Sequence, residues 1–208
     1  MSLTLYHSVG PNPKVVSMFL QEKGMLDQVD VVKVDLAAME NRQEAHLARN
    51  PMGQTPSLKL ADGRYLSESL AICEYLEELQ PEPSLFGRTP EERAMTRMWT
   101  RRIDLNIAHM MGWGFRSAEG LKFFTPRYEV LIPEGADGLK KATAAALGWL
   151  DRHFTGPWIC GERFSMADIL LFSWLEFGNR VGQPFDPGLR NLAGWFEQAN
   201  SRPSTAAL

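Results

Sequence analysis

A seven-residue stretch with two prolines constrains this chain more than any other feature. It reads Asn50-Pro51-Met52-Gly53-Gln54-Thr55-Pro56 and leads directly into an apolar strand start, Ser57–Leu60. Proline is excluded from helix interiors and central strands, so this stretch must be an irregular loop. The residue before a proline is held extended, and an X–Pro bond adopts the cis form at a cost of only about 0.5–1 kcal/mol. We expect a cis bond at Thr55-Pro56 that offers the Thr55 N–H and C=O to a peptide-like ligand.

Composition and charge narrow the class of protein. The 208 residues are 44% hydrophobic and 23% charged, as in a globular protein of one large or two small domains. The net charge of −3, with no run of lysine or arginine, argues against nucleic acid or an anionic membrane as a partner. No signal peptide and no run of about 18 apolar residues is visible, so we expect a cytoplasmic protein without a membrane span.

The cysteines and histidines form no local cluster. Cys73 and Cys160 are far apart and in no CxxC pattern, which fits a reducing compartment. The four histidines are scattered over positions 7, 46, 109 and 153. We therefore expect neither a disulfide framework nor a metal site.

Strand and helix patterns alternate in the first 80 residues. Strands are expected at 3–6, at 29–34 as a buried strand, and as a hairpin at 57–60 and 64–66. Helices are expected from an N-cap at Asn12 to a stop at Gly24, over a short segment ending near Arg49, and from a cap at Ser67. The order β-α-β-α-β-β-α joins a parallel βαβ unit to a hairpin. It predicts a thioredoxin-like α/β domain over residues 1–80.

The chain after residue 80 shows helical patterns throughout. Residues 81–87, which begin Pro81-Glu82-Pro83-Ser84, are expected to be a linker, followed by an all-α domain over 88–208. Thr89-Pro90-Glu91-Glu92 is a capping box, and it predicts a helix that reaches about Met111. Gly112 and Gly114 are expected to loosen the end of that helix.

A second capping box, Ser165–Asp168, marks the helix expected at the centre of the all-α domain. Residues 166–179 are apolar on nearly all sides, which predicts that this helix is buried. Around it the pattern predicts a loop or broken helix at 123–135 and an alanine-rich helix at 139–154. A last helix carries Leu192, Trp195, Phe196 and Ala199.

Three motifs together resemble the cytosolic glutathione transferase family, and the resemblance covers the whole chain. They are Asn50-Pro51-x-Gly53-x-x-Pro56, Leu66-x-Glu68-Ser69-x-Ala71-Ile72 and Gly161-x-x-Phe164-Ser165-x-Ala167-Asp168. They are similar to that family's glutathione loop with its cis-proline, its helix start for the γ-glutamyl group, and its structural capping box. The first loop, Gly10-Pro11-Asn12-Pro13, is similar to that of bacterial members. The resemblance implies the two-domain glutathione transferase architecture and a homodimer.

The resemblance also implies which residues bind glutathione, the tripeptide co-substrate. Thr55 and Pro56 would hold its peptide middle. The Ser69 N–H and hydroxyl can donate to the γ-glutamyl carboxylate, and Glu68 can accept from the amine. Arg42 and Gln54 fall where related transferases place a basic residue and an amide for the glycine end. Arg42 is equally consistent with a solvated helix charge.

Activation of the thiol requires a further group. A free thiol has a pKa near 8.5, and lowering it by two units takes about 2.7 kcal/mol of thiolate stabilisation, roughly one hydrogen bond plus a helix N-terminus. The serine of theta-like members falls at Gly10, so that helper is absent here. Asn12 is the favoured thiol donor, with Ser8 and then Tyr6 as alternatives. A plain N-cap is the competing role of Asn12.

The all-α domain is expected to contribute the hydrophobic co-substrate site. His109, Trp113 and Phe115 lie towards the end of its first long helix and could line a pocket for a small hydrophobic electrophile. The predicted function is glutathione transfer to that electrophile, or a glutathione-dependent reduction, in bacterial detoxification.

Two other functions compete with the enzyme. A regulatory or ligand-carrier protein that binds glutathione with weak catalysis remains open, because the family's serine and cysteine helpers are both missing. A thiol–disulfide oxidoreductase of glutaredoxin type is rejected, because residues 6 to 19 contain no cysteine.

Overall fold

The computed structural model describes residues 3–153 and 156–208. Contacts divide the chain into two compact units, one comprising residues up to Leu85 together with Pro203–Leu208, the other Phe86–Arg202. The division falls inside the linker predicted at 81–87. The last six residues, however, group with the first unit rather than with the helical one. Within the described ranges, no helix is long and apolar enough to cross a membrane.

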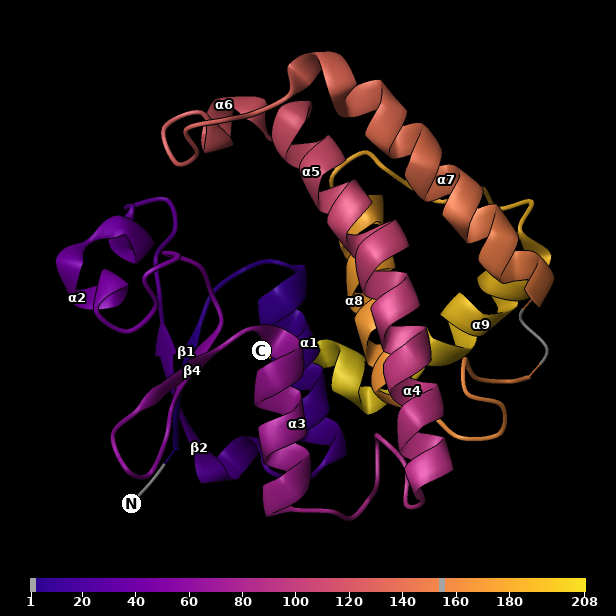
Figure 1. Ribbon diagram of the computed structural model, residues 1–208, viewed down its shortest axis with the longest axis horizontal. Helices are drawn as coiled ribbons and strands as arrows, with labels where there is room; N and C mark the ends of the chain where they lie inside the picture. Colours follow the sequence, from indigo (N-terminus) through magenta and orange to yellow (C-terminus); the bar gives the residue numbers. More distant parts are fainter. Residues whose placement is uncertain (1–2, 154–155) are drawn as a thin grey trace. The chain divides into compact units, whose positions relative to one another are not determined.

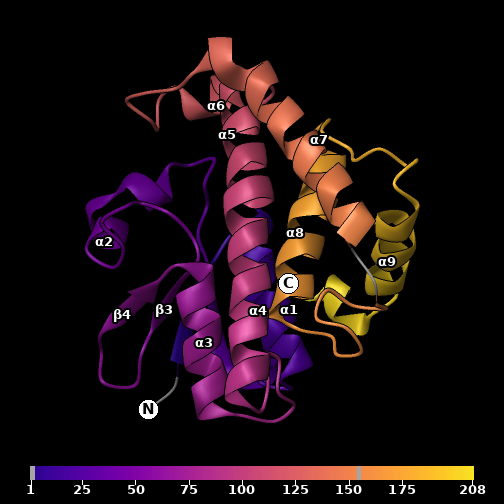
Figure 2. The same ribbon diagram turned by 45° about the vertical axis from the view of Figure 1, so that its right-hand side comes forward.

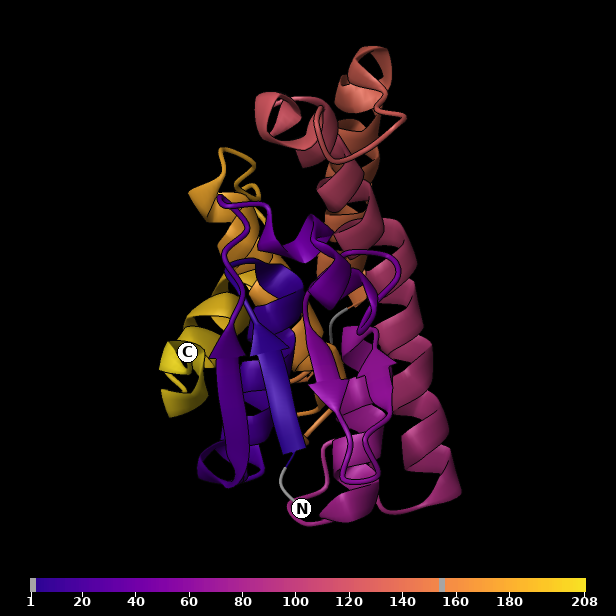
Figure 3. The same ribbon diagram turned by 90° about the vertical axis from the view of Figure 1, so that its left-hand side faces the viewer.

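A four-stranded mixed sheet forms the centre of the first unit. Its strands are β1 (Leu3–His7), β2 (Val29–Lys33), β3 (Ser57–Lys59) and β4 (Tyr65–Ser67), in the order β2-β1-β3-β4. Strand β1 runs parallel to β2 and antiparallel to β3, and β3 pairs antiparallel with β4, as Figure 3 shows. The predicted α/β order is confirmed. The expectation that 29–34 is buried throughout is wrong, because β2 is an edge strand in which Asp30–Lys33 are exposed.

Helices cover both faces of this sheet. Helices α1 (Pro11–Glu22) and α3 (Ser69–Leu79) pack against each other on one face, and the short α2 (Glu44–Leu47) lies on the other (Figure 1). Three 3₁₀ turns complete the unit, η1 (Leu26–Gln28), η2 (Glu40–Arg42) and η5 (Pro203–Ala206). The core under α1 and α3 consists of fully buried apolar side chains, including Leu5, Val16, Phe19, Leu58, Ile72 and Leu76.

Both helix caps predicted in this unit are displaced. Helix α1 begins at Pro11 with Gly10 as its N-cap, so Asn12 lies inside the first turn. The φ of Gly10 is 132°, which glycine adopts readily, and this allows the chain to turn two residues earlier than the pattern indicates. Helix α3 begins at Ser69 with Glu68, not Ser67, as its N-cap.

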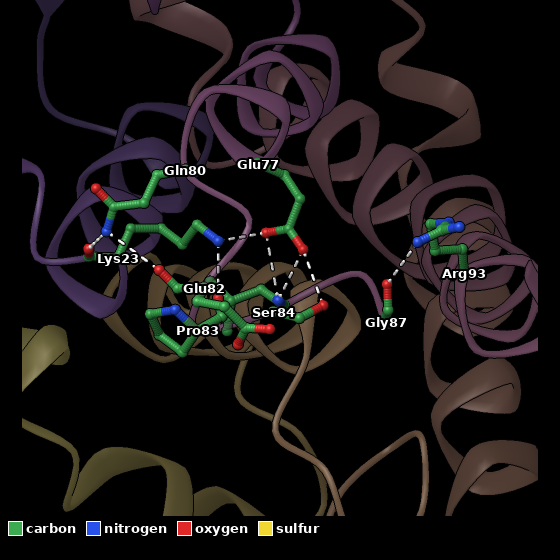
Figure 4. Close-up of polar contacts among 9 residues, drawn as sticks. Lys23, Glu77, Gln80, Glu82, Pro83, Ser84, Gly87 and Arg93 are labelled. Atoms are coloured by element: carbon green, nitrogen blue, oxygen red, sulfur yellow. Dashed lines mark hydrogen bonds and ion pairs between the residues drawn. The ribbon is translucent and has the colours of Figure 1, made fainter. Parts of the chain in front are cut away.

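A buried lysine joins α1, α3 and the segment that ends the first unit. The Lys23 side chain is fully buried, and its ammonium donates to Glu77 Oε2 and to the Pro83 carbonyl, each at 2.7 Å. Glu77 Oε1 accepts from the Ser84 hydroxyl and the Leu85 N–H at 3.0 Å (Figure 4). This network fixes residues 83–85 to the first unit.

Helices make up the second unit. A helical run comprises α4 (Pro90–Ile103), a π-helical turn η3 (Asp104–Ala108) and α5 (His109–Ser117), and Figure 2 shows α4 continuing into α5. The remaining elements are α6 (Leu121–Phe124), η4 (Pro133–Gly135), α7 (Ala136–His153), α8 (Met166–Arg180) and α9 (Arg190–Asn200). Helix α7 starts three residues earlier than expected, and its predicted end at Phe154 lies outside the described residues.

The first helical run continues beyond the expected end near Met111. Gly112 lies inside α5, where a Cβ atom would come within 2.9 Å of the Trp174 ring on α8. The glycine therefore allows close packing of two helices instead of ending one.

Helix α8 is buried as predicted, and both capping boxes are present. The Asp168 carboxylate accepts from the Ser165 N–H and hydroxyl, the Ile159 N–H and Trp195 Nε1, all at 2.8–2.9 Å. Burial raises the pKa of Asp168 to about 6, while these hydrogen bonds act to lower it. Asp168 thereby joins the start of α8 to α9.

Candidate functional site

The sheet register brings the predicted glutathione residues to one end of the sheet. Tyr6 on β1 is opposite Ser57 on β3, and Ser57 is opposite Ser67 on β4. At this end β1 finishes, β3 begins and β4 finishes. Ser8 follows β1, Thr55 precedes β3 and Ser69 follows β4. Residues up to 61 positions apart in the sequence therefore lie at the same end of the sheet.

Buried polar side chains hold the loop that precedes β3. The Gln54 carbonyl accepts from Asn50 Nδ2 and from His46 Nε2, each at 2.9 Å. Asn41 Nδ2 donates to the Gly53 carbonyl at 2.7 Å. All three of these side chains are at most 5% exposed. Sequence reasoning identified Asn50 but missed His46 and Asn41, for which a histidine and an asparagine in a polar segment gave no distinguishing signal.

Thr55 combines a fixed side chain with open backbone groups. The Thr55–Pro56 peptide bond is cis, and Thr55 Oγ1 forms a hydrogen bond with Ser8 Oγ. Neither the N–H nor the C=O of Thr55 makes a hydrogen bond with another described residue. Free backbone donors and acceptors in an extended segment are what a peptide ligand requires.

The start of α3 presents hydrogen-bond donors beside this loop. Glu68 has φ 68° and does not cap the helix through its side chain. The first N–H groups of a helix have no partner within the helix, and the N-terminal end of the macrodipole favours an anion. The Ser69 hydroxyl makes no hydrogen bond among the described residues. Glu68 holds a backbone conformation that costs a non-glycine residue about 1–3 kcal/mol, as is frequent at binding sites.

The first turn of α1 offers very few donors. Pro11 and Pro13 have no N–H, and the Lys14 N–H is bonded to the Gly10 carbonyl at 3.2 Å. Asn12 is therefore the residue of this turn whose backbone N–H is available. Its half-buried amide side chain also makes no hydrogen bond with the described residues.

Unlike the Asn12 amide, the side chains of the two alternative thiol donors already contact other residues. Ser8 is 3% exposed, and its hydroxyl bonds to Thr55 and to the Val9 carbonyl. The Tyr6 ring lies between the Arg49 guanidinium, 4.3 Å from its centroid, and the Tyr65 ring at 6.2 Å. Burial raises the pKa of Tyr6.

Arg42 and Gln54 also lie at this loop. Arg42 Nη1 is 3.4 Å from the Met52 carbonyl, and a Cβ at Gly53 would come within 2.9 Å of the same nitrogen. The φ of Gly53 is 61°, so glycine is required there both for conformation and for space. Gln54 contributes its carbonyl to the loop, as described above.

The three predicted co-substrate residues lie in the second unit and separate into two groups. His109 and Trp113 are one helical turn apart on α5, with ring centroids 6.3 Å apart. Phe115 is about 200° further round the helix from Trp113. Its ring contacts Phe124 and Phe177 at 5.8 and 5.0 Å, so Phe115 belongs mainly to the packing of α5 against α6 and α8.

The first unit is a thioredoxin-like mixed sheet with helices and the second is helical, and comparison with known families identifies this combination. Residues 9–79 match the family model "Glutathione S-transferase, N-terminal domain", and residues 113–203 match "Glutathione S-transferase, C-terminal domain". The chain therefore belongs to the glutathione S-transferase family. The predicted family, fold and class of enzyme, a glutathione transferase, are confirmed.

Individual relatives agree with the family models. Glutathione S-transferase 2 of Saccharomyces cerevisiae is 32% identical over 205 residues, which cover 96% of this chain and 85% of the yeast protein. Glutathione S-transferase GstA of Escherichia coli O157:H7 is 30% identical, with 97% and 94% covered. The crystal structure of Gtt2 from S. cerevisiae superposes with a TM-score of 0.89 at 28% identity, covering 97% of this chain and 98% of that one.

Proposed function

We propose that this chain binds glutathione at the sheet end marked by Ser8, Thr55 and Ser69 and promotes attack of its thiolate on a small hydrophobic electrophile. The thiol proton passes to solvent, the sulfur forms a bond to carbon, and the leaving group departs with its electron pair. A glutathione-dependent reduction is the alternative use of the same thiolate. The observation that carries the proposal is the open backbone of Thr55 beside the unpaired donors of α3.

Each part of glutathione has a partner in this arrangement. The Thr55 N–H and C=O pair with the cysteinyl residue, and the Ser69 N–H and hydroxyl donate to the γ-glutamyl carboxylate. Glu68 is exposed and accepts from the γ-glutamyl amine. Arg42 and Gln54 are assigned to the glycine end. Pro56 lies directly before β3, so the ligand's backbone would pair with the segment that leads into that strand.

Asn12 is proposed as the donor to the thiolate. The two prolines support this role, because they leave the Asn12 N–H and amide as the open donors in the first turn of α1. A hydrogen bond to a charged acceptor contributes about 1.5–3 kcal/mol, and the helix N-terminus adds about 0.3–1 kcal/mol. Together these match the stabilisation needed to hold the thiol as a thiolate near neutral pH.

The helical domain after the linker at 81–87 is proposed to supply the co-substrate site, with His109 and Trp113 at its wall and Phe115 supporting them. Membership in a family of named transferases favours this enzyme over a glutathione-binding regulatory or ligand-carrier protein. The Gly10-Pro11-Asn12-Pro13 loop supports a bacterial, cytoplasmic detoxification enzyme as the finer assignment.

We also propose a homodimer, which rests on the family resemblance. Exposed apolar side chains on α4, η3 and α7 support an interface there: Met95, Leu105 and Trp149 are 49%, 43% and 38% exposed. A hollow of about 280 Å³ between α4 and α7 is lined by Trp99 and Trp149, among others.

The thiol assignment is tested by titrating bound glutathione. The ultraviolet absorbance of the thiolate gives its pKa in the wild type, in Asn12→Ala, and in Ser8→Ala and Tyr6→Phe as matched controls. We expect Asn12→Ala to raise that pKa by about 1–2 units, since one charge-assisted hydrogen bond is lost, and to slow turnover of a chloronitrobenzene in parallel. An unchanged titration in Asn12→Ala, or a larger rise in Ser8→Ala, would show that the donor is another residue.

A further inference from the structure

Arg116 lies in a cluster of three aromatic rings near the end of α5. Its guanidinium carbon is 5.3 Å from the Trp113 ring centroid, 5.7 Å from that of Phe124 and 5.3 Å from that of Tyr128. Trp113 and Tyr128 also contact each other edge to face, with centroids 5.9 Å apart. We call these four side chains the Arg116 cluster. Such ring faces attract a cation and fix its position.

A tight turn after α5 brings the rings together. The Gly120 N–H donates to the Phe115 carbonyl at 2.8 Å, and a Cβ at Gly120 would come within 2.9 Å of the Phe115 ring. Glycine at 120 therefore lets the chain reverse closely against α5. Helix α6 and the loop after it then pass beside the end of α5, as Figure 1 shows for α6. Phe124 and Tyr128 reach Arg116 from that side.

The positive charge of Arg116 has no anionic partner in the described ranges. Arg116 makes no hydrogen bond or ion pair with another described residue. The nearby acid on the same turn, Glu119, is occupied by Lys140 and by Gln183 Nε2, the latter at 2.8 Å. The rings of the cluster are neutral, so they position the guanidinium without cancelling its charge. Charged groups withdrawn from water are usually paired, and this half-buried one is not.

The cluster shares a helix face with the proposed co-substrate residues. His109, Trp113 and Arg116 are spaced four and three residues apart, which places them on one side of α5. Trp113 belongs both to the Arg116 cluster and to the proposed co-substrate wall. A ligand that contacts Trp113 therefore comes within reach of the guanidinium.

We infer that Arg116 is a specificity-determining residue that binds a carboxylate on the electrophile. This inference rests on the proposed function of α5 as the co-substrate wall. The guanidinium fork matches a carboxylate with two parallel hydrogen bonds, and the rings around it pack against an aromatic or unsaturated body. The favoured co-substrates are therefore acidic aromatic or unsaturated electrophiles. In a chloroarene the thiolate sulfur bonds to the ring carbon and chloride leaves with the electron pair of the broken bond.

The test compares two probes of similar shape, an anionic chloronitrobenzoate and the corresponding neutral chloronitrobenzamide. Their dissociation constants are measured on the full chain by calorimetry without glutathione, so that the readout does not depend on turnover. The variants are Arg116→Gln, which removes the charge, and Arg116→Lys, which keeps it without the fork. Arg127→Gln is the matched control, because Arg127 also stacks on a ring, that of Phe123 at 3.5 Å, and follows α6, next to Tyr128 of the cluster.

The wild type is expected to bind the benzoate about tenfold more tightly than the benzamide, as one charge-assisted contact provides. Arg116→Gln should abolish this preference, Arg116→Lys should retain part of it, and Arg127→Gln should retain it in full. A wild type without preference, or an Arg116→Gln variant that keeps it, overturns the inference. If Arg116→Gln does not fold, Arg116→Lys provides the test: a reduced preference for the benzoate supports the inference, and an unchanged preference overturns it.

Turnover separates this inference from the proposed function. Glutathione and a neutral chlorodinitrobenzene are assayed in parallel with all variants. Turnover of the neutral substrate without an Arg116-dependent preference refutes the anion subsite alone. A preference that depends on Arg116 in a chain that turns over no electrophile refutes the proposed function and leaves the subsite standing.

Discussion

At the start of α1, single residues determine which donors a bound thiol could meet. The sequence favoured Asn12 as the thiol donor but also predicted it to be the N-cap of the helix, because asparagine before proline is typical of that position. Gly10, with φ 132°, takes the cap instead and moves Asn12 into the first turn. This shift removes the capping role from Asn12, since its side chain makes no cap hydrogen bond, and leaves the thiol-donor role as a proposal. It could not be predicted, because it depends on a backbone angle that glycine permits but does not require.

Glu68 is a second residue whose setting the sequence did not reveal. A positive φ of 68° is unusual for glutamate, and the pattern placed the cap one residue earlier. The motif nevertheless identified Glu68 and Ser69 as a pair at the helix start. The motif therefore predicted the start of α3 to within one residue, while the backbone geometry of Glu68 required the structure.

His7 provides a prediction about pH at the same scale. Its Nε2 is buried without a hydrogen-bond partner among the described residues. Burial lowers the pKa of His7 below its ordinary value of 6.5, although a hydrogen bond with the Pro13 backbone acts to raise it. The unfolded chain therefore takes up a proton near pH 6.5 that the folded chain does not, so stability present at higher pH is lost as pH falls below 6.5. Urea unfolding between pH 7.5 and about 5 is expected to show a steeper loss in the wild type than in His7→Phe.

His109→Phe, which removes an exposed histidine instead of a buried one, is the control for that measurement. The contribution of His7 is the difference between the two variants. Equal slopes for the wild type and His7→Phe would mean that His7 has the same pKa in the folded and unfolded chains.

At the scale of elements, predictions succeeded where local chemistry fixes the result. Both capping boxes and the all-round apolar pattern of 166–179 are satisfied within a few residues, so α4 and α8 start where expected. The predicted end of the first long helix near Met111 and the predicted burial of residues 29–34 were wrong. Both depend on neighbours: Gly112 packs against Trp174, and β2 has a partner on one side only. Local pattern does not contain that information.

The Lys23 network predicts a large cost for removing one partner. Lys23→Met would leave Glu77, with 13% of its side chain exposed, without its cation, and a broken buried pair costs about 3–5 kcal/mol. The double variant Lys23→Met with Glu77→Leu should cost less than Lys23→Met alone, because no uncompensated charge remains. Urea unfolding of each variant provides the free energies.

The exposed Arg64–Asp62 pair, with 78% and 50% of the side chains exposed, is the matched control. Arg64→Met is expected to change stability by no more than about 0.5 kcal/mol. If Lys23→Met cost no more than Arg64→Met, the network of Figure 4 would not hold residues 83–85.

At the scale of the whole molecule, the family was predictable and the path of the chain end was not. The three motifs lie in both units and identified the family, which the two family models and the relatives support over nearly the full chain. The return of residues 203–208 to the first unit rests on contacts such as Ser17 Oγ to the Ala207 carbonyl, 3.3 Å apart and 190 positions distant in sequence. No local pattern signals a contact of that separation.

A crystal structure of the full chain with glutathione tests the central claim most directly. The Thr55 N–H and C=O are expected within about 3 Å of the cysteinyl backbone, with the γ-glutamyl carboxylate on the Ser69 N–H and hydroxyl and the sulfur beside Asn12. Glutathione bound away from this sheet end, or a sulfur that contacts Ser8 or Tyr6 instead of Asn12, would contradict the account.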